Sequence, residues 1–336
     1  MCTRNRVTCV AEKTYIEAIR DGIREEMRRD ERVMILGEDV GAKGGVFGVT
    51  EGLQKEFGEA RVLDSPLAES LIVGVAIGAA MNGLRPIAEI QFQDFIMPAV
   101  DQIISEAAKM RYRSNGDWGV PMVVRSPFGG GVHGALYHSQ SIEAIFAHIP
   151  GLRVVVPSNP YDAKGMIISA LRDPDPVLYF EHKRCYRAIK GEVPDGEYTV
   201  PLDRARVVRE GEDIALFSYG MMVHTSLEAA DRLAADGFSC EVVDLRSLRP
   251  FDRPAIVASA RKCGKVLIVQ EANLAVSVAS EVAAIIAEDC FDSLDAPVMR
   301  LGGPEIPAMP FSPPLEQFYL VTPNKVEAKL RELAAY

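Results

Sequence analysis

The sequence predicts an α/β protein with two domains, each built on a mainly parallel β-sheet that is flanked by helices. Its length of 336 residues suits two domains. Short apolar runs alternate with longer helical patterns, as they do in parallel sheets covered on both faces. The alternation resumes after a polar, turn-rich stretch at 191–204. We therefore expect a first domain over 1–190, a linker at 191–204 and a second domain over 205–336.

In the first half, four apolar runs predict buried strands, and the periodicity between them predicts helices. The strands are expected at 33–37, 86–90, 121–125 and 152–156. Helices are expected at 97–112 and at 161–171. Such an order of strands and helices is typical of a parallel sheet whose crossover helices cover both of its faces.

A further helix is predicted by the long apolar run at 63–80. Ser65 can cap this helix, and Pro66 suits its first position. Because the run is apolar on every face, we expect the helix to be buried, with Glu69 entering the core. A buried carboxylate binds a strong partner or keeps its proton with a raised pKa, as a cofactor-activating acid does. The alternative is a first-turn Glu that only complements the helix dipole.

The second half repeats the alternation. Strands are expected at 213–219, 240–245 and 265–269, and another strand ends at 301–304. Helices are expected at 223–235 and 278–287, and an amphipathic helix at 325–335 closes the chain.

Composition and charge exclude several classes of protein. The formal net charge of −10 argues against nucleic acid and anionic membrane as partners. The sequence has no uninterrupted run of about twenty apolar residues, so no membrane-spanning helix is predicted. Residues 1–7 have a short basic tip but no secretory apolar region, so we expect a cytoplasmic protein. Six cysteines without a CxxC pair predict reduced thiols rather than disulfides or a zinc site.

Two glycine-rich stretches follow predicted strands. No GxGxxG stretch follows a predicted strand and opens a helix with an acidic residue about twenty positions further on, which argues against a nicotinamide site, and the Walker pattern is absent too. The stretch 37–48 is either a ligand loop or a plain surface loop. The stretch 125–140 carries His133 and His138 beyond the carboxyl end of a strand, where open α/β sheets bind ligands. A histidine there can transfer protons, although Tyr137 and His138 could instead only order the loop.

A third stretch, 88–102, leads from a strand into a helix through aromatic and amide side chains. Gln91, Phe92 and Phe95 could hydrogen-bond and stack on a planar ring. Core packing alone could also explain the two phenylalanines.

Together these stretches resemble the beta subunit of the thiamine-dependent decarboxylase component of 2-oxo acid dehydrogenase complexes. The similarity runs from Gly37-Glu38-Asp39 to Arg331-Glu332-Leu333. The stretches 133–141, 146–148 and 179–184 are most similar to branched-chain members of that family. The resemblance implies two transketolase-like domains, of which the first binds the aminopyrimidine half of thiamine diphosphate and the second mediates assembly. It also implies oxidative decarboxylation of branched 2-oxo acids with this cofactor, and reductive acylation of lipoamide.

The resemblance also assigns residues to the cofactor. Glu69 matches the family glutamate that hydrogen-bonds the aminopyrimidine ring nitrogen and thereby activates the thiazolium carbon. Leu67, Gln91 and Phe95 match positions that line the aminopyrimidine. Phe95 stands where the family often has Tyr, so the resemblance implies stacking at this position without a hydroxyl contact.

For the acyl-transfer step, the resemblance points to the second glycine-rich loop. His138 matches the family histidine that protonates the departing dithiolane sulfur when the acyl group passes to lipoamide. His133 lies in the same loop, and the resemblance gives it no definite role.

The resemblance further implies how metals are held and which partners are needed. Thiamine enzymes hold magnesium and diphosphate with a Gly-Asp-Gly stretch followed by Asn, and this sequence has none. An alpha subunit is therefore expected to hold the magnesium, in an α2β2 heterotetramer. The family also has a potassium site of backbone carbonyls, which by position would be those of Val120, Met122, Val123, Ala170, Asp173 and Asp175.

The expected partners are thus the alpha subunit, a small-molecule 2-oxo acid, and a dihydrolipoyl acyltransferase with its lipoyl domain. One alternative is the same subunit of a pyruvate or acetoin dehydrogenase. Another is a non-catalytic assembly subunit, which the joint presence of Glu69 and His138 disfavours. A transketolase or synthase that acts alone is disfavoured by the missing diphosphate motif.

Overall fold

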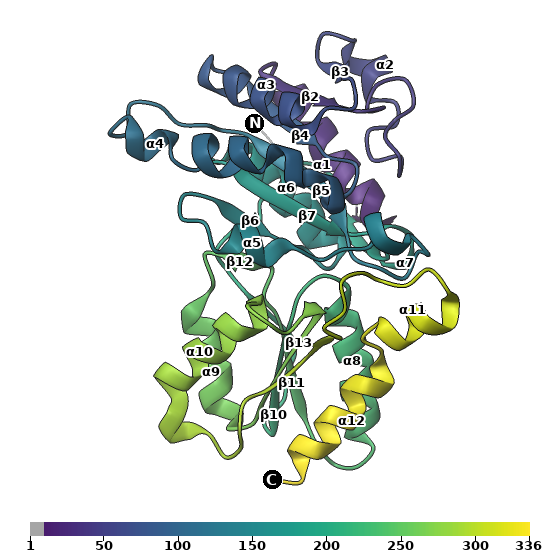
Figure 1. Cartoon of the computed structure of the whole chain (residues 1–336), viewed down its shortest axis with the longest axis vertical. Coiled ribbons are helices and arrows are strands. Elements are labelled where there is room, and N and C mark those ends of the chain that lie inside the picture. Colours follow the sequence, from purple (N-terminus) through teal and green to yellow (C-terminus); the bar gives the residue numbers. More distant parts are fainter. Residues whose placement is uncertain (1–9) are drawn as a thin grey trace, which may run out of the picture.

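The computed structural model describes residues 10–336 of the chain (Figure 1). The expectations for the amino-terminal tip, and those for Cys2 and Cys9, concern residues outside this range, so the cytoplasmic location stays a prediction. Among the described residues, no helix is both long and apolar enough to cross a membrane. The four cysteines within this range are free and buried, as expected: Cys185, Cys240, Cys263 and Cys290.

A seven-stranded sheet forms the centre of the upper half of the molecule in Figure 1. Its strands are β2 (Val33–Gly37), β3 (Val62–Asp64), β4 (Arg85–Glu89), β5 (Val123–Phe128), β6 (Arg153–Val155), β7 (Val177–His182) and β12 (Ser247–Arg249). Their order is β12-β6-β7-β5-β4-β2-β3, and only the pair β12 and β6 is antiparallel. The expected parallel sheet is therefore present.

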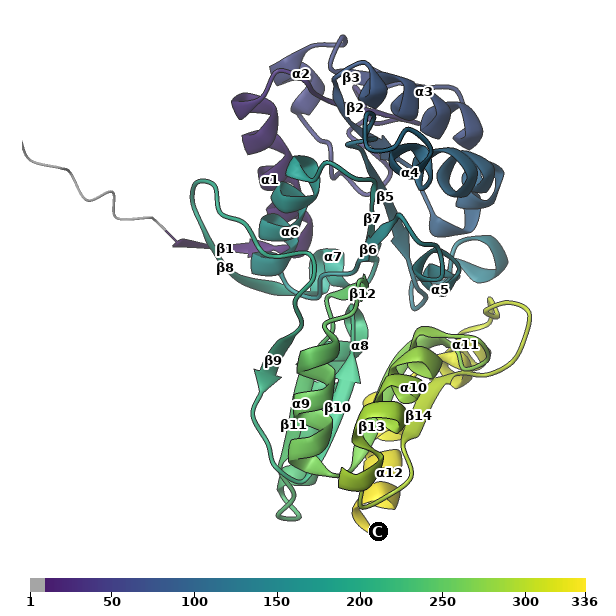
Figure 2. The same cartoon turned by 90° about the vertical axis from the view of Figure 1, so that its left-hand side faces the viewer.

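Helices cover both faces of this sheet (Figure 2). These are α1 (Tyr15–Arg29) and α6 (Pro160–Arg172) on one face, and α3 (Glu69–Met81), η1 (Gln93–Ala99) and η2 (Gln102–Ala107) on the other. Successive residues of a strand point to opposite faces. Val33 and Ile35 accordingly pack toward α1 and α6, while Met34 and Leu36 pack toward α3. The strands are mainly apolar because both faces of the sheet are buried.

A second, five-stranded sheet forms the lower half (Figure 1). Its strands are β9 (Arg206–Arg209), β10 (Ile214–Ser218), β11 (Cys240–Asp244), β13 (Val266–Asn273) and β14 (Met299–Gly303). In the order β14-β13-β10-β11-β9, only β9 is antiparallel to its neighbour. Helices α9 (Arg253–Cys263) and α10 (Val278–Cys290) cover one face, and α8 (Met221–Ala234) and α12 (Pro323–Ala334) cover the other.

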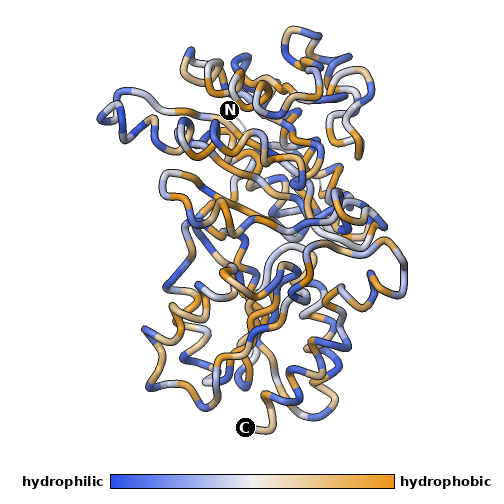
Figure 3. Tube along the Cα trace, in the orientation of Figure 1, coloured by the Kyte–Doolittle hydropathy of each residue, from blue (hydrophilic) through white to orange (hydrophobic). Residues whose placement is uncertain are grey.

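Hydrophobic residues are concentrated along the strands of both sheets (Figure 3). One core cluster extends from the α3 face of the first sheet to β10, α9 and α10 of the second half, so the two halves share buried apolar surface. The remaining short elements are α2 (Leu53–Phe57), α4 (Met110–Arg113), η3 (Ala135–Tyr137), α5 (Glu143–Ala147), α7 (Cys185–Ala188), η4 (Phe291–Ser293) and α11 (Pro313–Tyr319).

The expected linker contains structure that the sequence did not predict. Residues Lys190–Pro194 form β8, which pairs antiparallel with β1 (Val10–Thr14) in a separate two-stranded sheet. In addition, β12 lies in the second half of the sequence but extends the first sheet through β6. The two halves are therefore joined by strand pairing as well as by the connecting chain.

The helix expected at 97–112 is wrong as a single element. The chain forms a 3₁₀ turn, a π-helical turn and the short helix α4 in succession. Pro98 lies inside the first of these pieces and has no amide proton for a helical hydrogen bond. Local departures from α-helical geometry of this kind are frequent at functional sites.

The expectation that α3 is buried all round is also wrong. Helix α3 begins at Glu69, and its N-cap is Ala68 without a side-chain hydrogen bond, so Ser65 does not cap it. Ile72, Val73, Ala76, Ile77 and Ala80 are buried against the sheet. The opposite face exposes the apolar side chains of Leu71, Val75 and Met81. The sequence was apolar on both faces, but this chain alone covers only one of them.

Candidate functional site

The predicted site residues lie at the carboxyl edge of the first sheet. Gln91 and Phe95 follow β4, and His138 lies in the loop after β5. Glu69 begins α3, which packs against β4 and η1. Parallel strands end at the same edge, so the fold brings together segments that are far apart in the sequence.

A buried charge cluster fixes the strands beneath this edge. The Arg125 guanidinium is 1% exposed and donates to both carboxylate oxygens of Glu181, at 2.7 and 2.6 Å. It also donates to Glu89, so one cation links β4, β5 and β7. Burial raises the pKa of Glu89, and only part of this effect is offset by Arg125. Tyr186 completes the cluster by donating its hydroxyl to Glu181 at 2.5 Å.

Two aromatic rings hold the His138 imidazole. The ring centroid of Phe92 lies 4.6 Å from that of His138, with an interplanar angle of 87°. Phe95 makes a second edge-to-face contact at 5.3 Å and 84°. These contacts leave the imidazole half-buried, which keeps it within reach of a ligand. The structure therefore brings Phe95 and His138 together, as a shared site requires.

Lys183 lies directly beside this group. Its ammonium donates to the backbone carbonyl of His138 and lies 5.3 Å from the centroid of the Phe92 ring. Burial lowers the pKa of Lys183 to about 8, against the attraction of Asp94 and Glu271. A cation at this place fixes the backbone that carries the imidazole.

Glu69 is half-buried at the start of α3, not inside the core as expected. Burial and the nearby charges of Asp39 and Glu69 raise the pKa of Glu38. Glu38, which belongs to the first glycine-rich stretch, is therefore close enough to Glu69 for their charges to interact. Gln91 donates its side-chain amide to the backbone carbonyl of Glu38 at 3.4 Å. Glu38, near the start of the stretch 37–48, therefore lies beside Gln91 and Glu69.

Leu67 is unusual for a leucine because 71% of its surface is exposed. It precedes α3, and the exposed apolar side chains of α3 continue from it along the helix. Within residues 10–336, no donor of this chain binds the Glu69 carboxylate. Glu69 and Leu67 therefore lie on an open surface where a ligand or a partner protein can contact them.

The loop of residues 129–142 needs its glycines. Gly129 has a φ of +85°, and a Cβ there would lie 2.3 Å from His182 Nε2. His133 and Ala135 also have positive φ values, 57° and 54°, which are strained for residues with a side chain. This loop carries both predicted histidines, but it directs only His138 toward Phe92 and Phe95, whereas His133 pairs with Glu316.

Four residues that hold this loop were not predicted from the sequence. Asp94 and Lys183 lie within stretches that had been singled out, at 88–102 and 179–184. Glu271 and Glu316 come from the second half, and they contact the loop across more than 130 positions of sequence. No local pattern could have indicated those two.

The two segments predicted to bind potassium lie side by side, because the Val177 amide donates to the Met122 carbonyl at 3.0 Å. Arg85 donates to the carbonyl of Asp173 at 3.3 Å, so a positive charge already lies at one expected ligand. No cluster of three or more His, Cys, Asp or Glu side chains in residues 10–336 could hold a metal ion, and carbonyl cages fall outside that description. The potassium site stays a prediction.

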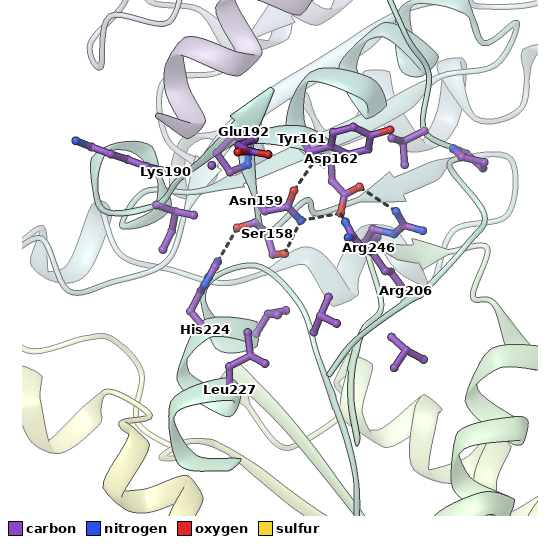
Figure 4. Close-up of a pocket in the computed structure, with 18 of the residues that line it drawn as sticks. Ser158, Asn159, Tyr161, Asp162, Lys190, Glu192, Arg206, His224, Leu227 and Arg246 are labelled. Atoms are coloured by element: carbon purple, nitrogen blue, oxygen red, sulfur yellow. Dashed lines mark hydrogen bonds and ion pairs between the residues drawn. The ribbon is translucent and has the colours of Figure 1, made fainter. Parts of the chain in front are cut away.

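A separate cavity of about 760 Å³ lies between the two halves (Figure 4). Asp162 projects into it and pairs with Arg246 at 2.9 Å, and His224 contacts the Ser158 carbonyl at 2.8 Å. Neither Glu69 nor His138 lines this cavity, so the predicted chemistry lies elsewhere.

Comparisons with known proteins agree with this architecture. The family described as "Transketolase, pyrimidine binding domain" matches residues 11–188, and "Transketolase, C-terminal domain" matches residues 203–326. A solved chain named "Split gene transketolase, inactive beta4 tetramer" superposes with a TM-score of 0.75. The match covers 96% of this chain and 98% of that one at 23% sequence identity, so it supports the fold alone.

Sequence relatives are much closer than this. The 2-oxoisovalerate dehydrogenase subunit beta of Bacillus subtilis (strain 168) is 62% identical over 323 residues, which are 96% of this chain and 99% of that protein. The pyruvate dehydrogenase E1 component subunit beta of the same organism is 52% identical, over 90% of this chain and 93% of that protein.

Proposed function

Because this chain belongs to the family of 2-oxo acid dehydrogenase beta subunits, which have two transketolase-like domains, we propose that it serves a branched-chain 2-oxo acid dehydrogenase. The proposed reaction is the thiamine diphosphate-dependent oxidative decarboxylation of branched 2-oxo acids, followed by reductive acylation of lipoamide. The observation that carries this proposal is the 62% identity to a 2-oxoisovalerate dehydrogenase subunit beta along nearly the whole chain. The pyruvate dehydrogenase relative, at 52% identity, is the second candidate.

The residues at the carboxyl edge fit the aminopyrimidine half of thiamine diphosphate. Glu69 offers a half-buried carboxylate, Gln91 offers an amide, and Phe95 offers an aromatic ring on η1, which packs against α3. When bound, thiamine diphosphate would supply a nucleophilic thiazolium carbon and a ring that serves as the electron sink for decarboxylation. In this site, Glu69 would hold a proton at the ring nitrogen and Leu67 would cover the ring.

His138 would act in the second half of the reaction. A dithiolane sulfur that leaves as a thiolate needs a proton, and an imidazole is suited to donate it near neutral pH. Phe92 and Phe95 fix the plane of the imidazole ring. We assign no chemical step to His133, because its imidazole pairs with Glu316 at 2.6 Å.

This chain would hold only half of the cofactor. The sequence lacks the Gly-Asp-Gly stretch for magnesium and diphosphate. The apolar face of α3, which exposes Leu71, Val75 and Met81, starts at Glu69. An exposed apolar surface of this kind marks a contact with another protein. We therefore propose that an alpha subunit covers the site and holds the magnesium, in an α2β2 heterotetramer that passes its product to a lipoyl domain of the acyltransferase.

The isolated chain is accordingly expected neither to bind thiamine diphosphate tightly nor to decarboxylate a 2-oxo acid. The test is a calorimetric titration of purified chain with cofactor and magnesium, in the presence and absence of the alpha subunit. Tight binding should need both subunits. Tight binding by the chain alone would contradict the half-site and would favour an enzyme that acts without an alpha subunit.

Branched 2-oxo acids are expected to be better substrates than pyruvate for the assembled enzyme. Each additional methylene that fits an apolar pocket contributes about 1–3 kcal/mol, or about 10–200-fold in specificity. The measurement is kcat/KM for 2-oxoisovalerate and for pyruvate, with an excess of lipoyl domain. A clear preference for pyruvate would replace the branched-chain assignment with the pyruvate dehydrogenase one and would leave the roles of Glu69 and His138 unchanged.

A further inference from the structure

The loop of residues 129–142 is held by two carboxylates from the second domain. Glu316, on α11, accepts the backbone amides of Gly131 and His133 with one oxygen, both at 3.1 Å. Its other oxygen lies 2.6 Å from His133 Nδ1. Glu271, on β13, accepts the Gly130 amide at 2.6 Å. These hydrogen bonds fix the start of the loop against the second domain.

Glu271 also connects the loop to β7. Its second oxygen lies 3.1 Å from His182 Nε2, and its first oxygen is 3.5 Å from the Ser141 hydroxyl. Burial opposes ionisation of Glu271, but His182 and the Gly130 amide outweigh this and keep its pKa below the ordinary value. A carboxylate that stays charged makes stronger hydrogen bonds to amides than a neutral group does.

The end of the loop is held from the first domain. Asp94 accepts the amides of Ser139 and Gln140 at 3.2 and 3.1 Å. Lys183 donates to the carbonyl of His138 itself. His138 thus lies between anchors at 130–133, from the second domain, and anchors at 138–140, from the first.

Within the loop, the Gly129 amide donates to the Gln140 carbonyl at 3.0 Å, and the Gln140 side-chain amide donates to the Leu136 carbonyl at 3.3 Å. Between the anchors the loop forms only the short turn η3, and the side chains of Val132, Leu136 and Tyr137 are exposed. His133 and Ala135 are strained at positive φ. Strained backbone persists only where the surroundings determine it, and Glu316 contacts the strained segment directly.

We infer that Glu316 is a positioning residue for His138: the second domain takes part in acyl transfer by holding the loop that carries this histidine. The inference rests on the role proposed for His138. Glu316 is 2% exposed and lies behind the loop, so it acts through the loop and not on the substrate. This extends the second domain beyond a role in assembly.

Two variants of Glu316 can distinguish a role in positioning His138 from a role in folding. Glu316→Ala removes all three contacts to the loop. Glu316→Gln keeps one carbonyl oxygen for the backbone amides, and its NH₂ group can donate to His133 Nδ1. Catalytic groups displaced by about 1 Å lose on the order of 100-fold in rate. We expect Glu316→Ala to lose about 10- to 100-fold in acyl transfer, and Glu316→Gln to recover most of it.

The experiment uses the assembled enzyme with its alpha subunit. Decarboxylation is measured with an artificial electron acceptor, and acylation is measured with free lipoyl domain, so that kcat and KM are obtained for each. The expected result for Glu316→Ala is a lower kcat of acylation, with decarboxylation and the KM for lipoyl domain nearly unchanged. Asp213→Ala is the matched control, because Asp213 accepts the Ser239 amide at 2.6 Å just before β10, at the opposite edge of the second sheet.

His138→Ala, measured alongside, separates the two hypotheses. If His138→Ala selectively loses acylation and Glu316→Ala does not, the positioning inference is wrong and the proposed function stands. If His138→Ala shows no selective loss, the proposed role of His138 itself fails. An equal loss of both activities in Glu316→Ala, or a loss that Glu316→Gln does not relieve, would assign Glu316 to general folding and overturn the inference.

Discussion

Glu69→Gln is expected to abolish most cofactor activation in the assembled enzyme while leaving the fold intact. An amide cannot exchange a proton with the aminopyrimidine ring nitrogen as a carboxyl group can. Loss of a charge-assisted contact that is used in the transition state costs about 3 kcal/mol or more, which is on the order of 100-fold or more in rate. The fold should persist because Glu69 is half-buried and lies at the first position of α3, outside the core.

The direct measurement is the rate of hydrogen–deuterium exchange at the thiazolium carbon. Glu31→Gln provides a matched control, since Glu31 is exposed and lies before β2, at the opposite edge of the same sheet. Thermal unfolding of both variants reports on the fold. An exchange rate that Glu69→Gln leaves unchanged would remove Glu69 from the mechanism.

His138→Ala is expected to separate the two half-reactions. Decarboxylation with an artificial electron acceptor should continue, because the imidazole is assigned only to protonation of the departing sulfur. Transfer of the acyl group to lipoyl domain should fall by about 100-fold or more, the usual scale for a lost general acid. Both activities are measured on the same heterotetramer preparation.

His148→Ala is the matched control for this variant, because His148 follows α5 and is exposed. It should retain both activities. If His138→Ala loses both activities equally, His138 would instead serve cofactor placement or decarboxylation. The edge-to-face contacts with Phe92 and Phe95 would then be the structural basis for that role.

Most of the parallel strands could be predicted from sequence because burial on both faces makes them mainly apolar. Residues 33–37 form β2 with the expected bounds, and the helix expected at 161–171 is α6 with one more residue at each end. The short edge strand β12 has only one apolar residue, Leu248, and it pairs with β6 some 90 positions earlier. A pairing that depends on tertiary contacts leaves no periodicity in three residues.

Helix α3 could be predicted from the sequence only in part. Its apolar run was correctly predicted as a helix, but apolar composition does not tell which molecule covers each face. Leu71 and Val75 are exposed in this chain, and we propose that a partner subunit buries them. Because this chain covers only one face of α3, Glu69 is half-buried at the start of the helix and does not lie inside the core.

The site was predicted in part from residue chemistry and in part from family resemblance. The histidines of the second glycine-rich loop were singled out from the residues themselves, whereas for Phe92 and Phe95 the residues alone favoured core packing. The structure brings His138 and Phe95 together. The specific roles of Glu69 and His138 came from the resemblance. In the sequence, Asp94 is only one polar residue among aromatic ones. Its hydrogen bonds to the amides of Ser139 and Gln140 form between segments about 45 positions apart, so only the folded structure reveals them.

The pairing of β12 with β6 has a consequence for how the protein unfolds. Without residues 247–249, β6 would become an unprotected sheet edge, and such edges promote aggregation. The apolar core that extends from α3 to α10 would also lose the buried side chain of Leu248. We therefore expect the two halves to unfold as a single cooperative unit, and we expect fragments divided at the linker not to fold independently.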